Sequence, residues 1–191
     1  DHGDALGEHG IYAEHAFPHP PCQRVPMVVS WPGVTGDATD WDGKQYQFDL
    51  LPTVCDIAGV DVPAGWNARS FAPGVRGDDY EGRESLVCGH GIYTFGRAVY
   101  RDDWAFIRLL HPGVFSMPGQ YNDPEMPEHG LELLHHRGED PHMTENLVAE
   151  CPEVAADLRA TLDGWVVEQV AGDEPAGMGP VIGGAGLEGT T

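Results

Sequence analysis

The first fifteen residues limit most strongly the structure and function that this chain can have, because they are rich in metal-binding side chains and poor in core-forming ones. Residues 1–10 hold three carboxylates, two imidazoles and three glycines, and a further imidazole follows at His15. Carboxylate oxygens and imidazole nitrogens are common protein ligands of divalent cations. Glycines let the backbone make tight turns close to a bound ligand. The stretch therefore predicts a loop around a binding site and not a part of a hydrophobic core. We also expect the chain to be a piece of a larger protein.

Acidic residues dominate the charge of the chain. There are 31 Asp and Glu residues against 10 Lys and Arg residues, for a formal net charge of -21. Such a surface repels the phosphates of nucleic acids, so we expect no nucleic-acid partner. The acids are spread along the chain, which favours a surface adapted to molar salt over an acidic interaction protein, because salt screens their repulsion.

Composition also bears on compartment and redox chemistry. Hydrophobic residues make up 41% of the chain, which is typical of a folded domain. No apolar run approaches the roughly 18 residues that a membrane helix needs, so we expect no membrane partner. No targeting segment is visible, which favours the cytoplasm. The four cysteines form no C-x-x-C pair, and we expect free thiols, with Cys55 and Cys88 buried.

The first half of the chain predicts one strand and one helix. Three prolines near its end make residues 1–24 a predicted loop. Residues 25–31 are apolar and partly β-branched, which predicts a strand buried on both faces. Residues 48–59 carry apolar side chains at helical spacing, with Asp49 as the expected N-cap and Gly59 as the expected stop.

The second half predicts an antiparallel sheet and a long helix. Short apolar strands are expected at residues 84–88, 96–100, 104–110 and 131–134. Residues 152–170 have one apolar stripe and predict an amphipathic helix. We therefore expect the end of an α/β catalytic domain at residues 1–83, a C-terminal α+β subdomain at 84–171 and a disordered tail at 172–191.

Several motifs, in order along residues 1–170, together resemble the sulfatases of the alkaline phosphatase superfamily. They are D-H-G-x-x-L-G-E-H-G from Asp1, D-x-x-P-T from Asp49, R-A-V from Arg97 with W-x-x-I from Trp104, and L-E-L-L from Leu131 with D-P-H-x-x-E-N-L from Asp140. The resemblance implies an α/β protein, the C-terminal part of an alkaline-phosphatase-like sulfatase fold. That part ends in a small antiparallel sheet packed with one long helix.

The resemblance also implies a chemistry. Sulfatases hydrolyse sulfate esters at a bound divalent cation, usually calcium, with a formylglycine nucleophile made from a C-x-P-x-R type motif. By this resemblance Asp1 and His2 are the expected metal ligands. No C-x-P-x-R or S-x-P-x-R occurs here, so the chain alone is expected to be inactive. The sulfate-contacting lysine of the family falls on Glu14, and we therefore assign the proton-donor role to His15.

Other residues and other functions stay open at this stage. His90, at the end of a predicted strand, is a candidate substrate contact, whereas His19, His135 and His136 are expected at the surface. The expected substrate is a small-molecule or carbohydrate sulfate ester. One alternative is a phosphodiesterase or phosphonate monoester hydrolase of the same superfamily. Another is a non-catalytic acidic module whose histidine-rich loop binds metal.

Overall fold

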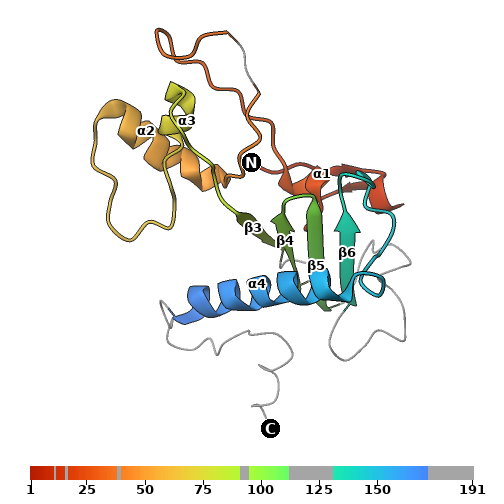
Figure 1. The fold of residues 1–191 in the computed structure, drawn as a ribbon. Coiled ribbons are helices and arrows are strands. Elements are labelled where there is room, and N and C mark those ends of the chain that lie inside the picture. Colours follow the sequence, from red (N-terminus) through yellow and green to blue (C-terminus); the bar gives the residue numbers. More distant parts are fainter. Residues whose placement is uncertain (11, 16, 38–39, 91–94, 112–130, 172–191) are drawn as a thin grey trace. The chain divides into compact units, whose positions relative to one another are not determined.

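A computed structural model describes residues 1–10, 12–15, 17–37, 40–90, 95–111 and 131–171 (Figure 1). Contacts divide the chain into two compact units. One unit is Asp1 with residues 26–86, and the other is residues 2–25 with residues 87–191. The histidine-rich opening stretch therefore packs with residues that follow far along the sequence, whereas the sequence analysis grouped it with residues 26–83.

The second unit is built on a four-stranded sheet of order β3-β4-β5-β6. Its strands are β3 (Ser85–His90), β4 (Phe95–Arg101), β5 (Trp104–His111) and β6 (Leu131–His136). The pairs β4–β5 and β5–β6 are antiparallel, and Asp102, at φ 49°, lies in the turn between the first two of these strands. All four strands predicted from the sequence are confirmed.

Helix α4 (Pro152–Ala171) lies across one face of this sheet (Figure 1). The core between them contains Val87, Val99, Phe106 and Leu134 from the strands and Ala155, Leu158, Leu162 and Val166 from the helix. The strand residues alternate along each strand and the helix residues recur every three or four positions, so each set forms one apolar face. At the edge of this core, Glu132 accepts hydrogen bonds from Arg108 and from Arg159.

The opposite face of the sheet is covered by the segment that follows the opening stretch. Phe17, Pro18 and His19 are buried there, next to helix α1 (Pro20–Gln23). The hydroxyl of Tyr100, on β4, donates a hydrogen bond to the carbonyl oxygen of Pro18. The predicted loop of residues 1–24 is therefore anchored on the sheet and contains short elements that the sequence analysis did not expect.

The unit of residues 26–86 contains η2 (Gln47–Asp49), α2 (Leu50–Ala58) and α3 (Ala72–Arg76). The predicted helix is confirmed as α2, and Gly59 ends it with a φ of 68°. Asp49 precedes the helix, but its side chain does not cap α2. The carboxylate is buried and accepts hydrogen bonds from the backbone N–H groups of Tyr46 and Arg69.

The buried strand predicted at residues 25–31 is absent. These residues form no strand in the described structure, and the side chain of Val28 is 93% exposed. Leu51 and Val54, on the apolar side of α2, are also exposed. An apolar segment becomes a buried strand only when neighbouring strands and a covering layer exist, and no described strand pairs with residues 25–31.

Other predictions are corrected or fall outside the described residues. Cys22 is the buried cysteine, whereas Cys55 and Cys88 are half-buried, and no cysteine in the described part of the chain is in a disulfide. Burial raises the pKa of the Cys88 thiol to about 11. The tail predicted at residues 172–191 lies outside the described residues. Among the described helices, none is long and apolar enough to cross a membrane.

Candidate functional site

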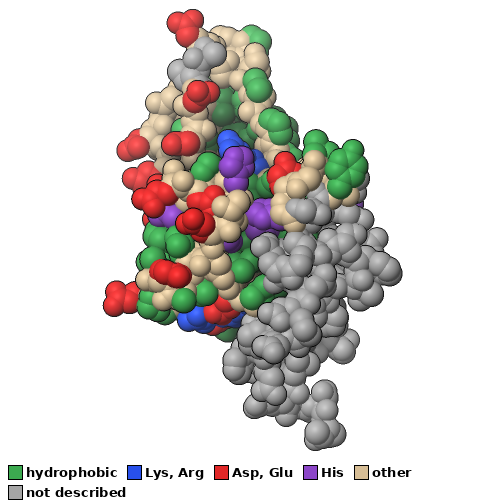
Figure 2. All heavy atoms as spheres, turned by 90° about the vertical axis from the view of Figure 1, so that its right-hand side faces the viewer, with side chains coloured by type: hydrophobic (Ala, Val, Ile, Leu, Met, Phe, Trp, Pro, Cys, Tyr) green, Lys and Arg blue, Asp and Glu red, His purple; other side chains and the backbone are tan. Residues whose placement is uncertain are grey.

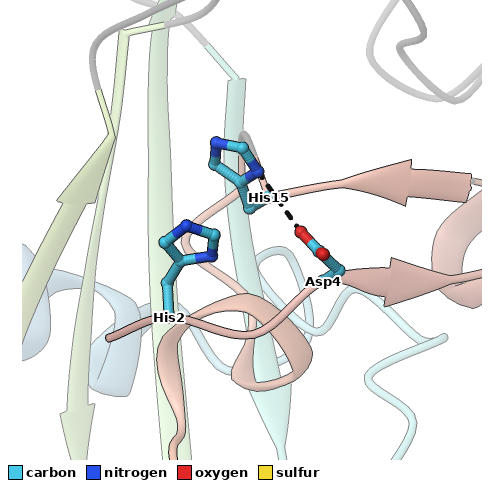
Figure 3. A group of neighbouring side chains, drawn as sticks. All are labelled: His2, Asp4 and His15. Carbon is cyan, nitrogen blue, oxygen red and sulfur yellow. Dashed lines mark hydrogen bonds and ion pairs between the residues drawn. The ribbon is translucent and has the colours of Figure 1, made fainter.

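A short hairpin in the opening stretch places Asp4 next to His15. Its strands are β1 (Ala5–Leu6) and β2 (Tyr12–Glu14), and Ala5 pairs with Glu14 in an antiparallel register. Continuing that register by one residue sets Asp4 opposite His15. The Nδ1 atom of His15 lies 3.2 Å from Oδ1 of Asp4, close enough for a hydrogen bond (Figure 3).

His2 completes a group of three potential ligands. Its ring stacks on that of His15, with 4.3 Å between the centroids and 28° between the planes. One ligand atom from each of His2, Asp4 and His15 can be chosen so that all lie within 4.8 Å of one another. In the described part of the chain this is the one group of three or more such side chains that could hold a metal ion.

The backbone next to His2 explains why a glycine follows it. The N–H of Gly3 donates a hydrogen bond to the carbonyl oxygen of Cys22 at 2.9 Å. A Cβ atom at Gly3 would lie 2.0 Å from the carbonyl oxygen of Pro21. Only glycine permits this close approach, which joins the His2 backbone to helix α1.

The tip of the hairpin is held by a carboxylate. Glu8 lies in η1 (Glu8–Gly10), and its Oε2 accepts a hydrogen bond from the backbone N–H of Leu6 at 2.5 Å. Hydrogen bonds from its own backbone N–H and from that of Leu6 lower the pKa of Glu8. Glu8 is therefore occupied in shaping the turn and stays ionised.

A second histidine cluster consists of the half-buried His9 and the buried His19 and His135. The ring of His9 is 4.1 Å from that of His19, which is 6.3 Å from that of His135. His19 is 2% exposed and His135 is 3% exposed, so the expectation that both lie at the surface is wrong. The Nδ1 atom of His135 donates a hydrogen bond to the carbonyl oxygen of Glu145 at 2.6 Å. Burial lowers the pKa of all three imidazoles, that of His19 most.

The structure brings together some of the predicted site residues. His2 and His15 lie side by side, and Asp4, which was not predicted as a site residue, joins them. Asp1 is exposed and is not part of the group. His90 ends strand β3, and nothing is described of its side chain or of that of Glu14. The sequence could have indicated Asp4 if the residues on either side of the glycine-rich turn had been paired as a hairpin, because that pairing sets Asp4 opposite His15.

The surroundings of the site are acidic. Figure 2 shows histidine side chains next to acidic ones on one face of the molecule. With a net charge of -21, the chain attracts cations and repels anions.

The sheet, the long helix and the associated segments have the fold of the C-terminal part of sulfatases. Residues 7–101 match the family model described as "N-sulphoglucosamine sulphohydrolase, C-terminal". The structure is similar to that of a 2-O GAG sulfatase, with a TM-score of 0.71 and 26% identity over 90% of this chain and 35% of that one. These similarities support a sulfatase C-terminal portion.

Two curated relatives are similar in sequence. The Delta 4,5-hexuronate-2-O-sulfatase of Bacteroides thetaiotaomicron is 27% identical over 172 residues, which cover 87% of this chain and 33% of the relative. The N-acetylglucosamine-6-O-sulfatase of the same organism is 33% identical over 73 residues, covering 38% of this chain and 13% of the relative. The chain thus spans about a third of the length of the first of these relatives.

Proposed function

We propose that this chain is the C-terminal portion of a sulfuric ester hydrolase that acts on a small-molecule or carbohydrate sulfate ester. The observation that carries this proposal is the match to a curated sulfatase along 87% of the chain. The names of both curated relatives specify sulfated sugars. The sulfatase fold of the sheet and helix supports the same assignment.

We assign Asp1 and His2 to a divalent cation, which we expect to be calcium. A carboxylate oxygen at Asp1 fits the preference of calcium for oxygen ligands. Calcium takes about six to eight oxygen ligands, so this assignment requires further ligands besides Asp1 and His2. The cation supplies positive charge for the oxygens of a sulfate ester, and it offsets the acidic surroundings.

We assign the proton-donor role to His15. Asp4 accepts a hydrogen bond from Nδ1 of His15, which orients the imidazole and leaves Nε2 to carry and release a proton. The side chain of His15 is 40% exposed, so a substrate can reach it. This arrangement fits a general acid that protonates the oxygen of a leaving group.

Two further assignments complete the proposal. His90 contacts the substrate from the end of β3. The nucleophile is a formylglycine outside this chain, because the sequence contains no C-x-P-x-R or S-x-P-x-R motif. The 191-residue chain alone therefore does not turn over sulfate esters.

The test uses the intact protein that carries this chain. We expect it to release sulfate from 2-O-sulfated hexuronate or 6-O-sulfated N-acetylglucosamine, and to prefer these to the matching phosphate and phosphonate esters. His15→Ala should lower kcat by about a hundredfold, whereas His142→Ala, at an exposed position outside the group, should leave kcat unchanged. Preferred phosphonate or phosphodiester turnover would replace the proposal by the superfamily alternative. Metal binding without any ester hydrolysis would favour the non-catalytic module.

A further inference from the structure

We propose that His2, Asp4 and His15 form a cation site of the zinc class, distinct from the calcium position assigned to Asp1 and His2. The two sites share His2, so they exclude each other. A cation in the zinc-class site also engages His15 and so withdraws it from proton donation. This last consequence rests on the proposed function, whereas binding of the cation does not.

The separations in the group fit a small ion. Two ligands at about 2.0–2.1 Å from a tetrahedral zinc ion are roughly 3.3 Å apart. Nδ1 of His15 and Oδ1 of Asp4 are 3.2 Å apart. One ligand atom from each of the three side chains lies within 4.8 Å of the others, and the His2 side chain is exposed. Figure 3 shows both imidazoles beside the Asp4 carboxylate.

The donor atoms select the class of metal. Two imidazole nitrogens and one carboxylate oxygen suit zinc, copper, nickel and cobalt, whereas calcium sites are built mainly from oxygen ligands, so the second imidazole favours the zinc class. Asp4 is the single oxygen donor of the group. Three protein ligands also leave a fourth position for water, as in open zinc sites.

The backbone holds the three side chains in place before any ion arrives. Ala5, next to Asp4, is 3% exposed and pairs with Glu14, which precedes His15. Gly3, next to His2, is hydrogen-bonded to Cys22. All three ligands are thus adjacent to anchored residues, and this lowers the entropic cost of assembling the site.

Occupation of the site has a consequence for the proposed reaction. A cation on Nδ1 of His15 takes the place of the proton on that nitrogen. The ring then cannot become an imidazolium whose Nε2 releases a proton to the leaving group. The cation also takes the Asp4 oxygen that orients His15. Zinc-class cations should therefore inhibit sulfate ester turnover, and they should do so at the concentrations at which they bind.

The direct test is a titration of the metal-stripped intact protein with Co²⁺, whose visible absorption reports nitrogen and oxygen ligands. We expect one saturable absorption change that Zn²⁺ reverses at far lower concentrations than Ca²⁺ does. His15→Gln and Asp4→Asn should each weaken Co²⁺ binding by about tenfold or more. His142→Ala is the matched control and should bind as tightly as the unmodified protein. Circular dichroism and the melting temperature establish that each variant is folded.

The opposite results overturn the inference. They are unchanged Co²⁺ affinity in both His15→Gln and Asp4→Asn, an equal loss in His142→Ala, or displacement of Co²⁺ by Ca²⁺ as readily as by Zn²⁺. If the protein hydrolyses sulfate esters but these substitutions leave its Co²⁺ affinity unchanged, the inference fails and the proposed function stands. If Co²⁺ binds at the group but no sulfate ester is hydrolysed, the proposed function fails and the metal site stands.

Discussion

Arg83 and Asp49 form a two-point ion pair, with Nη2 of the arginine 2.5 Å from Oδ1 of the aspartate and Nε 3.0 Å from Oδ2. The Asp49 side chain is 1% exposed and that of Arg83 is 11% exposed. Since the same carboxylate accepts the N–H groups of Tyr46 and Arg69, it joins three separate segments around the start of α2. This pair is a main determinant of the unit of residues 26–86.

Breaking this pair should destabilise the protein strongly. Arg83→Ala leaves the Asp49 carboxylate buried without its cation, and such a change costs about 3–5 kcal/mol of unfolding free energy. The control is Arg76→Ala at the pair with Asp56, where both side chains are about a third exposed. An exposed pair contributes roughly 0–1 kcal/mol. Urea unfolding of both variants measures the difference, and equal losses would contradict the prediction.

Gly3→Ala should disturb the candidate site. The added methyl group would meet the carbonyl oxygen of Pro21 at 2.0 Å, so the backbone near His2 has to move. Overpacking of this kind costs about 1–3 kcal/mol. Gly36→Ala is the control, because a Cβ there meets nothing within 4 Å. Thermal unfolding and Co²⁺ binding should both be weakened in Gly3→Ala only, and unchanged metal affinity would contradict this prediction.

Gly164→Ala should stabilise the protein. Gly164 lies inside α4 at an exposed position, and a Cβ there meets no atom within 4 Å. Glycine in a helix interior is less favourable than alanine by about 0.5–1 kcal/mol, because it loses more backbone entropy on folding. We expect a rise in Tm with no change in Co²⁺ affinity, and a lower Tm would show that the glycine is required.

The buried histidines should make stability depend on pH. Burial lowers the pKa of His9, His19 and His135 in the folded protein, so below the unfolded value of 6.5 the unfolded chain binds more protons. The unfolding free energy is therefore highest above pH 6.5 and falls as the pH drops below it. The charged groups that act on these rings are Glu8, Asp140 and His142.

His19→Phe tests that assignment, because phenylalanine keeps a buried ring without a titrating nitrogen. We expect a smaller fall in unfolding free energy between pH 6.5 and about pH 5 than in the unmodified protein. His2→Phe serves as the control, because His2 is exposed and is not among the groups that act on these rings. An unchanged pH slope in His19→Phe would mean that other groups cause the acid sensitivity.

Local sequence patterns predicted most of the regular elements. Short apolar runs predicted β4 and β5, and the apolar stripe predicted α4, because each pattern depends only on near neighbours. The pattern at residues 25–31 was equally apolar, yet it forms no strand in the described structure. An isolated apolar run cannot specify a strand, because its hydrogen-bond partners come from elsewhere in the chain or from outside it.

The sequence by itself determined the types of donor in the opening stretch and the two imidazoles, His2 and His15, that the candidate site uses. Gly3 stands next to His2 in the sequence, but the close approach of Pro21 that requires a glycine there is visible only in the structure. Only the tertiary structure decided that Asp4 pairs with His15 and that His19 is buried beneath His9. Strand register and burial arise from contacts between residues far apart in the chain, and no local pattern encodes those contacts.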